Sequence, residues 1–274
     1  MLFDAHLRLA GVGGRDVGDL RFFGVAGALC PSGDPAAANA ASVRRGWERL
    51  AGPAVRRLRR QGLATYAALG VHPRRIPWRG LEALLAELPD LLGRPEVVAI
   101  GEIGLEEGGG REEEVLARQL EIARELRLPV VVRTPWKDAV RLTRRILAML
   151  RESELEPGRV LVGHADARTV RMVRACGYRA GLWLSSGAGA LEAAVRLVRS
   201  LGAEGLVLGS GAGEGGDLLA LPRAADRLAR AGLSDAVVRR VCGLNALAVL
   251  GLEARSLAPG GRAASGRSGR RASP

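Results

Sequence analysis

The sequence is short of several residue types, and each shortage excludes a class of protein. Aromatic residues make up only 3% of the 274 positions, too few for the stacking platforms on which many proteins hold single-stranded nucleic acid. The three cysteines, Cys30, Cys176 and Cys242, are odd in number and far apart in the chain. We therefore expect reduced thiols in a cytoplasmic protein and no disulfide framework.

Long apolar runs are also missing. No stretch approaches the roughly 18 consecutive apolar residues of a membrane span. Asp4 interrupts the first apolar residues before they form the hydrophobic region of a secretion signal. These absences predict a cytoplasmic protein with no membrane partner.

Positive charge comes almost entirely from arginine. Lys137 is the single lysine among 41 basic residues, and these outnumber the 29 acids by 12. We interpret this excess as a compositional bias that leaves a solvated arginine-rich surface. The alternative is a face that binds nucleic acid nonspecifically through charge. The last 20 residues carry five arginines and no acid among Ser, Gly and Pro, so residues 253–274 are predicted to be a disordered tail.

The rest of the chain, in a sequence that is 47% hydrophobic, alternates short apolar runs with helical patterns. Runs at 1–7, 24–30, 66–71, 97–103, 129–133, 159–164, 178–184 and 205–210 are predicted strands, and helices are predicted over 42–61, 81–92, 112–126, 137–151, 169–175, 191–201, 218–231 and 234–250. Nearly continuous hydrophobicity is typical of parallel strands buried on both faces. The order predicts an α/β protein, a single-domain (β/α)₈ TIM barrel over residues 1–252, with a doubly wound open sheet as the alternative.

Polar side chains gather at the carboxyl ends of the predicted strands. The three histidines, His6, His72 and His164, end the first, third and sixth strands. Glu102 ends the fourth strand, and Arg133 ends the fifth. In a barrel all these strand ends open on one face, where active sites lie. A carboxylate there must also meet a positive or proton-donating partner, so we expect these residues to form one site.

Several motifs, taken in order, resemble those of TatD-like hydrolases in the amidohydrolase superfamily. They are DAHLR at 4–8, GVHP at 70–73, GEIGL at 101–105, the segment 128–135, GH at 163–164 and GLNA at 243–246. The resemblance runs from Met1 to about Leu252 and implies a TIM barrel with one or two divalent metals. It also implies hydrolysis, classically of phosphodiester bonds in DNA, because two cations sharing a carboxylate activate a water.

The resemblance further implies a set of six metal ligands, of which this chain keeps three. His6, Glu102 and His164 match family ligands, whereas Arg8 and Arg133 stand where histidines are expected. The place of the final aspartate falls at Gly211 or Gly213. A guanidinium has no lone pair for a metal and repels it. The first hypothesis is therefore a divergent hydrolase in which His6, Glu102 and His164 are catalytic residues that hold one residual Zn, Mn or Mg ion, with His72 near the substrate.

The second hypothesis is a pseudoenzyme without metal. In it Arg8 and Arg133 pair with Glu102 and hold a small phosphorylated or carboxylate ligand. Ser210, Gly211 and Gly213, in the glycine-rich loop 209–216, are expected to offer backbone N–H groups to the same anion. The third hypothesis is nonspecific nucleic-acid binding by the basic surface and tail. The sequence leaves catalytic activity open between these alternatives.

Overall fold

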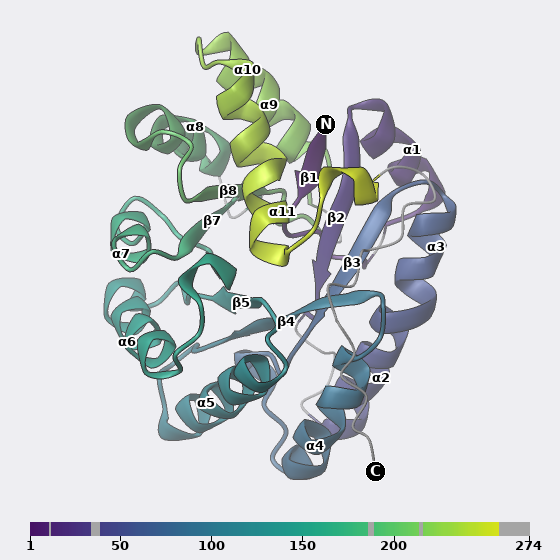
Figure 1. Ribbon diagram of the computed structural model, residues 1–274, viewed down its shortest axis with the longest axis vertical. Helices are drawn as coiled ribbons and strands as arrows, with labels where there is room; N and C mark the ends of the chain where they lie inside the picture. The colour runs from purple at the N-terminus through teal and green to yellow at the C-terminus, as the bar shows by residue number, and fades with distance from the viewer. Residues whose placement is uncertain (11, 34–38, 186–188, 214–215, 258–274) are drawn as a thin grey trace, which may run out of the picture.

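The chain folds as a barrel of parallel strands surrounded by helices (Figure 1). The structure is a computed structural model and describes residues 1–10, 12–33, 39–185, 189–213 and 216–257. One eight-stranded sheet has the order β1-β2-β3-β4-β5-β6-β7-β8, and every neighbouring pair is parallel. A strand order that follows the chain confirms the predicted (β/α)₈ barrel and excludes the open doubly wound sheet, in which the order reverses.

Seven of the eight strands overlap their predicted runs closely, while β1 is shorter than predicted. The strands are β1 (Leu2–Asp4), β2 (Val25–Pro31), β3 (Ala64–Leu69), β4 (Val97–Gly104), β5 (Val130–Arg133), β6 (Val160–Gly163), β7 (Arg179–Trp183) and β8 (Leu206–Gly209). The helices between them are α1 (Gly14–Phe22), α2 (Ala40–Arg49), η1 (Leu50–Ala54), α3 (Val55–Arg60), η2 (Pro73–Arg75), α4 (Leu81–Leu92), α5 (Gly110–Glu125), α6 (Ala139–Glu152), η3 (Pro157–Arg159), α7 (Val170–Ala175), α8 (Ala190–Leu201), α9 (Ala220–Arg230), α10 (Asp235–Arg239), η4 (Arg240–Leu244), α11 (Asn245–Leu250) and η5 (Ala254–Leu257).

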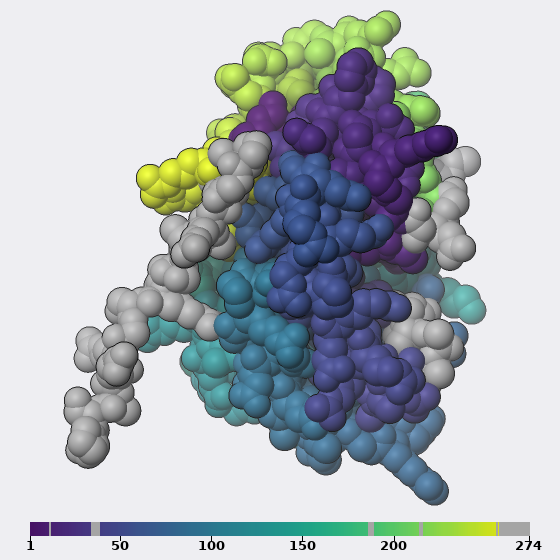
Figure 2. Space-filling model, turned by 90° about the vertical axis from the view of Figure 1, so that its right-hand side faces the viewer, coloured from purple at the N-terminus to yellow at the C-terminus, as the bar shows by residue number. Residues whose placement is uncertain are grey.

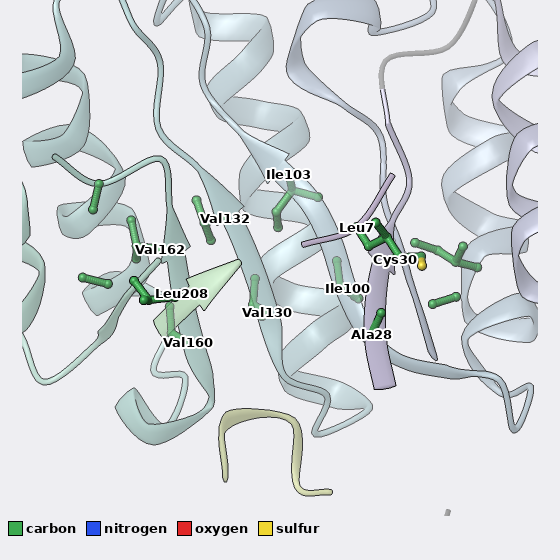
Figure 3. Close-up of a cluster of buried hydrophobic side chains, with 14 of the residues drawn as sticks. Leu7, Ala28, Cys30, Ile100, Ile103, Val130, Val132, Val160, Val162 and Leu208 are labelled. Atoms are coloured by element: carbon green, nitrogen blue, oxygen red, sulfur yellow. The ribbon is translucent and has the colours of Figure 1, made fainter. Parts of the chain in front are cut away.

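Alternation along each strand divides the core into two layers. Val130 and Val132 of β5 pack outward against the helices, as part of the cluster shown in Figure 3. Val131, between them, belongs to a second cluster inside the barrel with Phe3 and Tyr66. Both sides of the strand are thus apolar, because successive side chains point to opposite faces.

Contacts at the carboxyl end bring the first and last strands together, and contacts at the other end hold α11 against β8. At the carboxyl end, the Gly211 N–H donates to the His6 carbonyl over 2.9 Å and the Arg8 N–H donates to the Ala212 carbonyl over 2.8 Å. At the other end, the Asn245 side-chain amide, at the start of α11, donates to the Ala203 and Leu206 carbonyls, each over 2.7 Å. The C-terminal helices thereby cover the amino end of the barrel, where Leu247 and Leu250 of α11 join the inner cluster.

The first third of the chain holds two departures from the predicted elements, on the side of the molecule that Figure 2 shows in purple and blue. Helix α1 was not predicted; its segment is rich in glycine, and only Val17 and Leu20 are buried in it. The helix predicted over 42–61 is broken at η1, where Gly52 has non-helical φ −146° and ψ −105° before Pro53. Proline lacks an N–H and clashes with the preceding turn, so a continuous helix is disfavoured there.

The C-terminal boundary also differs from the prediction. Residues Ala254–Leu257 form the short helix η5, and Leu257 is buried in the inner cluster that includes Phe3. The ordered body therefore includes five residues that we assigned to the tail, because the burial of one leucine holds them against the barrel. Residues 258–274 lie outside the described part of the chain. None of the helices in the described ranges is long and apolar enough to cross a bilayer.

Candidate active site

Three of the predicted site residues meet at the carboxyl end of the barrel. His6 follows β1, Glu102 lies in the last part of β4, and His164 follows β6. The Nε2 atoms of His6 and His164 each lie 3.3 Å from Glu102 Oε1. One potential ligand atom from each residue lies within 4.8 Å of those from the other two. The predicted convergence of distant strand ends on Glu102 is thus present in the structure.

An irregularity in β4 places Glu102 in this position. Ile100 pairs with Val130 and Ile103 with Val132, so β4 holds one more residue than β5 over this stretch. Such a bulge redirects a side chain at the rim of a barrel. Ser32, after β2, supports the bulge: its hydroxyl lies 2.9 Å from the carbonyls of both Gly70 and Gly101.

His72 is the third imidazole beside Glu102. Its Nε2 lies 3.7 Å from Glu102 Oε2, while its Nδ1 accepts a 3.3 Å hydrogen bond from the Arg74 N–H. Because Nδ1 serves as the acceptor, neutral His72 carries its proton on Nε2, facing the carboxylate. Gln119 of α5 fixes the preceding residue, since its Oε1 accepts the Val71 N–H over 2.6 Å. Neither Gln119 nor Ser32 was predicted from the sequence to belong to the site.

Arg133 contacts the site, but its partners differ from our expectation. Its Nε lies 3.3 Å from Glu106 Oε2, and its Nη1 lies 3.1 Å from His164 Nε2. Glu106 also pairs with Arg74 over 2.8 Å. The pairing of Arg133 with Glu102 proposed in the second hypothesis is therefore wrong among the described residues. Glu102 Oε1 lies beside the Nε2 atoms of His6 and His164 instead, and Arg133 pairs with Glu106, which was not predicted from the sequence.

His164 Nε2 faces two groups with opposite requirements. Arg133 only donates hydrogen bonds, whereas the Glu102 carboxylate only accepts them. A neutral imidazole nitrogen is either a donor or an acceptor, so Nε2 satisfies one neighbour at the expense of the other. His164 also has a left-handed backbone, with φ 56°, a conformation that non-glycine residues rarely adopt and that clusters at functional sites.

Charges in this cluster are shifted by burial and by one another. Burial alone would raise the pKa of Glu102, but the charge of His6 and hydrogen bonds from His164, His6 and His72 hold that pKa well below its usual value. Burial lowers the pKa of His164 to about 4, despite the opposing effect of Glu102. At neutral pH the cluster therefore combines an ionised carboxylate with an uncharged His164, the protonation states that metal ligands require.

Arg8 and Trp183 fill the space beside Gly213 and Gly211, the two positions at which the resemblance places the final aspartate ligand. A Cβ on Gly213 would lie 3.0 Å from Arg8 Cβ, so the arginine stem covers this glycine. Gly211 has φ +64°, and a Cβ there would lie 2.9 Å from Trp183 Cβ. Neither glycine has room for a carboxylate side chain in this backbone. The buried Nε of Arg8 has no hydrogen-bond partner among the described residues.

Most of the backbone N–H groups that were predicted to bind an anion in the glycine-rich loop donate hydrogen bonds within the protein instead. The Ser210 N–H donates to Asp4 Oδ1 over 2.9 Å, and the Ser210 hydroxyl lies 3.3 Å from the His6 carbonyl. The Gly211 N–H is used by His6, as described above, and the Ala212 N–H donates to Ser210 Oγ. These donors tie β8 to β1. Residues 214 and 215 of the loop lie outside the described ranges.

Two tryptophans that the sequence analysis did not name complete the site. The Trp183 ring, at the end of β7, lies 4.8 Å from the His6 ring between centroids. Its buried indole N–H has no acceptor in the described part of the chain. The Trp136 ring stands edge-to-face to the His164 ring at 5.9 Å. Four glycines lie close to the Trp183 side chain: Gly163, Gly181, Gly209 and Gly211. Their lack of side chains is the sequence feature that indicates a bulky residue in this space.

The donor set fits one divalent cation. Two imidazole nitrogens and a carboxylate oxygen converge, and Nδ1 of His6, Nδ1 of His164 and Oε2 of Glu102 are buried without hydrogen-bond partners among the described residues. A cation held by these three residues would replace the contacts of 3.3 Å that the Nε2 atoms of His6 and His164 make with Glu102 Oε1. Arg133 Nη1 would also have to move away from His164 Nε2, while its pairing with Glu106 stays in place.

Comparison with known proteins agrees with this geometry. A family model described as TatD related DNase matches residues 41–212. An uncharacterized metal-dependent hydrolase of Methanocaldococcus jannaschii is 30% identical over 173 residues, which is 63% of this chain and 68% of that protein.

Solved structures extend the likeness to nearly the whole chain. The crystal structure of a TatD-like protein from Archaeoglobus fulgidus has a TM-score of 0.78 at 27% identity, covering 91% of this chain and 100% of that one. The phosphotriesterase homology protein of Escherichia coli, crystallised with phosphate in its active site, has a TM-score of 0.70 at 18% identity, covering 89% and 96%; that likeness shows the fold alone. Because the family model matches more than half of this chain, the chain belongs to the TatD related DNase family of metal-dependent hydrolases.

Proposed function

We propose that this protein hydrolyses phosphoester bonds with one divalent ion bound by His6, Glu102 and His164. The observation that carries the proposal is the convergence of these three ligand atoms within 4.8 Å at the carboxyl end of the barrel. Two histidines and one carboxylate form a known catalytic zinc set, whereas magnesium prefers oxygen ligands. We therefore favour zinc over manganese and magnesium. When bound, such an ion lowers the pKa of a water and polarises a phosphoryl oxygen.

The surrounding residues have separate roles in this proposal. His72 directs its Nε2 proton toward Glu102, where it donates to an oxygen of the substrate or its leaving group. Arg133, which is 2% exposed and held by Glu106, presents the positive charge that a phosphoryl group requires. Arg8, with its unpartnered buried Nε, supplies a second cation at the opposite side. Because the family is described as one of DNases, nucleic acid is a candidate substrate alongside small phosphoesters.

Metal analysis of protein purified without chelator tests this proposal. We expect close to one zinc per chain, a higher melting temperature on adding zinc, and hydrolysis of a chromogenic aryl phosphodiester. Glu102→Gln should abolish all three effects. Glu113→Gln, which removes a half-buried carboxylate paired with Arg145 outside the site, should leave them unchanged. A protein that neither contains nor responds to zinc, manganese or magnesium would contradict the proposal.

A second candidate function is metal-free binding of a small phosphorylated or carboxylate ligand. The contact of 3.1 Å between Arg133 Nη1 and His164 Nε2 favours it, because the arginine then takes the lone pair that a metal needs. In this case phosphate should raise the melting temperature of chelator-treated protein, and Arg133→Ala should remove the effect. Stabilisation by phosphate that appears only after metal is added would favour the hydrolase instead.

A further inference from the structure

A cavity opens beside the ligand cluster, and none of the proposed roles uses it. It measures about 230 Å³ and lies between Trp136, the β6 end at His164, the β7 end at Trp183 and the helix α8. An apolar cavity of roughly 150 Å³ is large enough to hold benzene. The available space therefore accommodates one aromatic ring and is too small for a dinucleotide.

Most of the cavity wall is apolar because of the pattern along α8, and the one acidic residue of the lining, Asp166, is paired with Arg168. Ala190, Ala193, Ala194 and Leu197 line it from one face of that helix. These positions recur at the three- and four-residue spacing of a helical stripe. Alanine at three of them leaves space that larger side chains would fill. Leu182 and the two tryptophans complete an apolar lining at the end nearest the barrel.

One end of the cavity meets the ligand cluster directly. His164 belongs both to the cavity wall and to the cluster around Glu102. Its Nε2 is the atom that Arg133 approaches, so an anionic group leaving the cavity at His164 meets the guanidinium of Arg133 and the three residues that would hold the metal. Trp136 is 51% exposed beside this opening, which leaves an aromatic surface available to a ring. A ligand that spans both regions therefore has a flat apolar part and an anionic end.

We infer that the cavity is a specificity pocket for a single aromatic ring, and that the preferred ligands are small aryl esters of phosphate. The ring lies between Trp136 and the alanine stripe of α8, and its phosphate group lies at the ligand cluster. For the charged end of the ligand, this inference rests on the proposed function. For the ring, it rests on the cavity alone, so the two parts are separable by experiment.

Titration calorimetry on the full-length, metal-loaded protein compares phenylphosphonate, an analogue of phenyl phosphate that has no ester bond to hydrolyse, with inorganic phosphate. We expect phenylphosphonate to bind roughly tenfold to a hundredfold more tightly, as burial of one ring implies. Ala193→Leu should fill the cavity and bring the two affinities together, with phosphate binding unchanged. Ser200→Leu adds the same side chain at an exposed position of α8 outside the cavity and should keep the preference. Melting temperatures establish that both variants are folded.

Phenol tests the ring site without the anion. Saturation-transfer NMR should detect phenol bound to the wild type and to Ser200→Leu, and a clear loss of that signal in Ala193→Leu. If metal fails to bind while phenol still shows this dependence, the proposed function fails and the ring pocket stands. Equal affinities for phenylphosphonate and phosphate, or phenol binding that is indifferent to Ala193→Leu, would overturn the pocket.

Discussion

Arg133 decides the chemistry of the site at the scale of single residues. A guanidinium nitrogen lies 3.1 Å from the imidazole nitrogen that would hold the metal. At a separation of about 4 Å and an effective dielectric near 20, a unit positive charge and a divalent cation repel each other by roughly 8 kcal/mol. Glu106 offsets part of this repulsion because it pairs with Arg133. The remaining repulsion, and the competition for one lone pair, should weaken metal binding relative to a site with histidine here.

We predict that Arg133→His raises zinc affinity at least about tenfold, because it removes the competing charge and adds an imidazole ligand. Calorimetric titration with zinc measures the change. Arg133→Met, which removes the charge without adding a ligand, should give a smaller increase. Arg145→His makes the same substitution in a pair with Glu113 away from the site and should have no effect. If Arg133→His binds zinc no better than the wild type, Arg133 does not limit the site.

At the scale of elements, one hydroxyl connects the segments that follow β2 and β3 with the last part of β4. Ser32 Oγ accepts the Gly70 N–H over 2.9 Å and lies at the same distance from the carbonyls of Gly70 and Gly101. His72 lies two residues after Gly70, and Glu102 follows Gly101 directly. The contacts of one serine with two backbone segments thus position two site residues that come from different strands.

We predict that Ser32→Ala lowers the free energy of unfolding by about 1–3 kcal/mol, because the buried Gly70 N–H loses its acceptor. Zinc affinity should fall as well, since Glu102 loses the support of its backbone. Urea unfolding and zinc titration measure the two effects. Ser153→Ala removes a hydroxyl that donates to Leu150 at the end of α6 and serves as the control. Comparable losses in both variants would mean that Ser32 has no special role.

A second feature at the scale of elements is the set of glycines that pack around Trp183, which come from β6, β7 and the end of β8. A Cβ on Gly163 would lie only 2.6 Å from Trp183 Cζ2, closer than two carbons pack. The glycines therefore match the volume of one indole. This arrangement places the Trp183 ring against His6 and gives the cavity part of its wall.

We predict that Gly163→Ala destabilises the protein by about 1–3 kcal/mol, because the added methyl overpacks the barrel mouth. In a Trp183→Leu background the same substitution should be nearly neutral, which gives a coupling of at least about 1 kcal/mol in a double-mutant cycle. Urea unfolding of the four proteins measures it. Gly110→Ala, where no atom lies within 4 Å of the new Cβ, should be additive with Trp183→Leu. Additivity for Gly163→Ala as well would argue against a shared packing unit.

For the whole molecule, periodicity and motif order were sufficient to predict the barrel and the central ligand cluster. Val130–Arg133 and Leu206–Gly209 are apolar strands whatever surrounds them, so local composition identifies them. Glu106, Gln119 and Trp183 could not be found in the same way. Their roles depend on residues from other strands and helices, as in the pairing of Glu106 with Arg133, 27 residues further along the chain. Helix α1 and the break at Gly52 were missed because glycine and proline carry no periodic signal.

The last five described residues link overall stability to overall charge. Leu257 is 5% exposed, so removing it should cost about 2–5 kcal/mol. Truncation after Leu257 removes four arginines and no acid, and truncation after Leu252 removes five arginines and Glu253. The two truncated proteins therefore have the same net charge and differ in whether Leu257 covers the inner core.

We predict that truncation after Leu257 keeps the wild-type melting temperature, whereas truncation after Leu252 lowers it by several degrees. Both truncations should weaken nonspecific binding to duplex DNA equally, because that binding depends on charge. If all four arginines beyond Leu257 contact phosphates, the slope of log Kd against log salt concentration should become shallower by about 3.6. Differential scanning calorimetry and fluorescence anisotropy at several salt concentrations measure the two quantities.

Unequal losses of DNA affinity would show that Leu257 and the fold, rather than charge alone, contribute to binding. An unchanged salt slope after either truncation would exclude the terminal arginines from DNA contact and leave the arginines of the barrel surface as the source of any such binding.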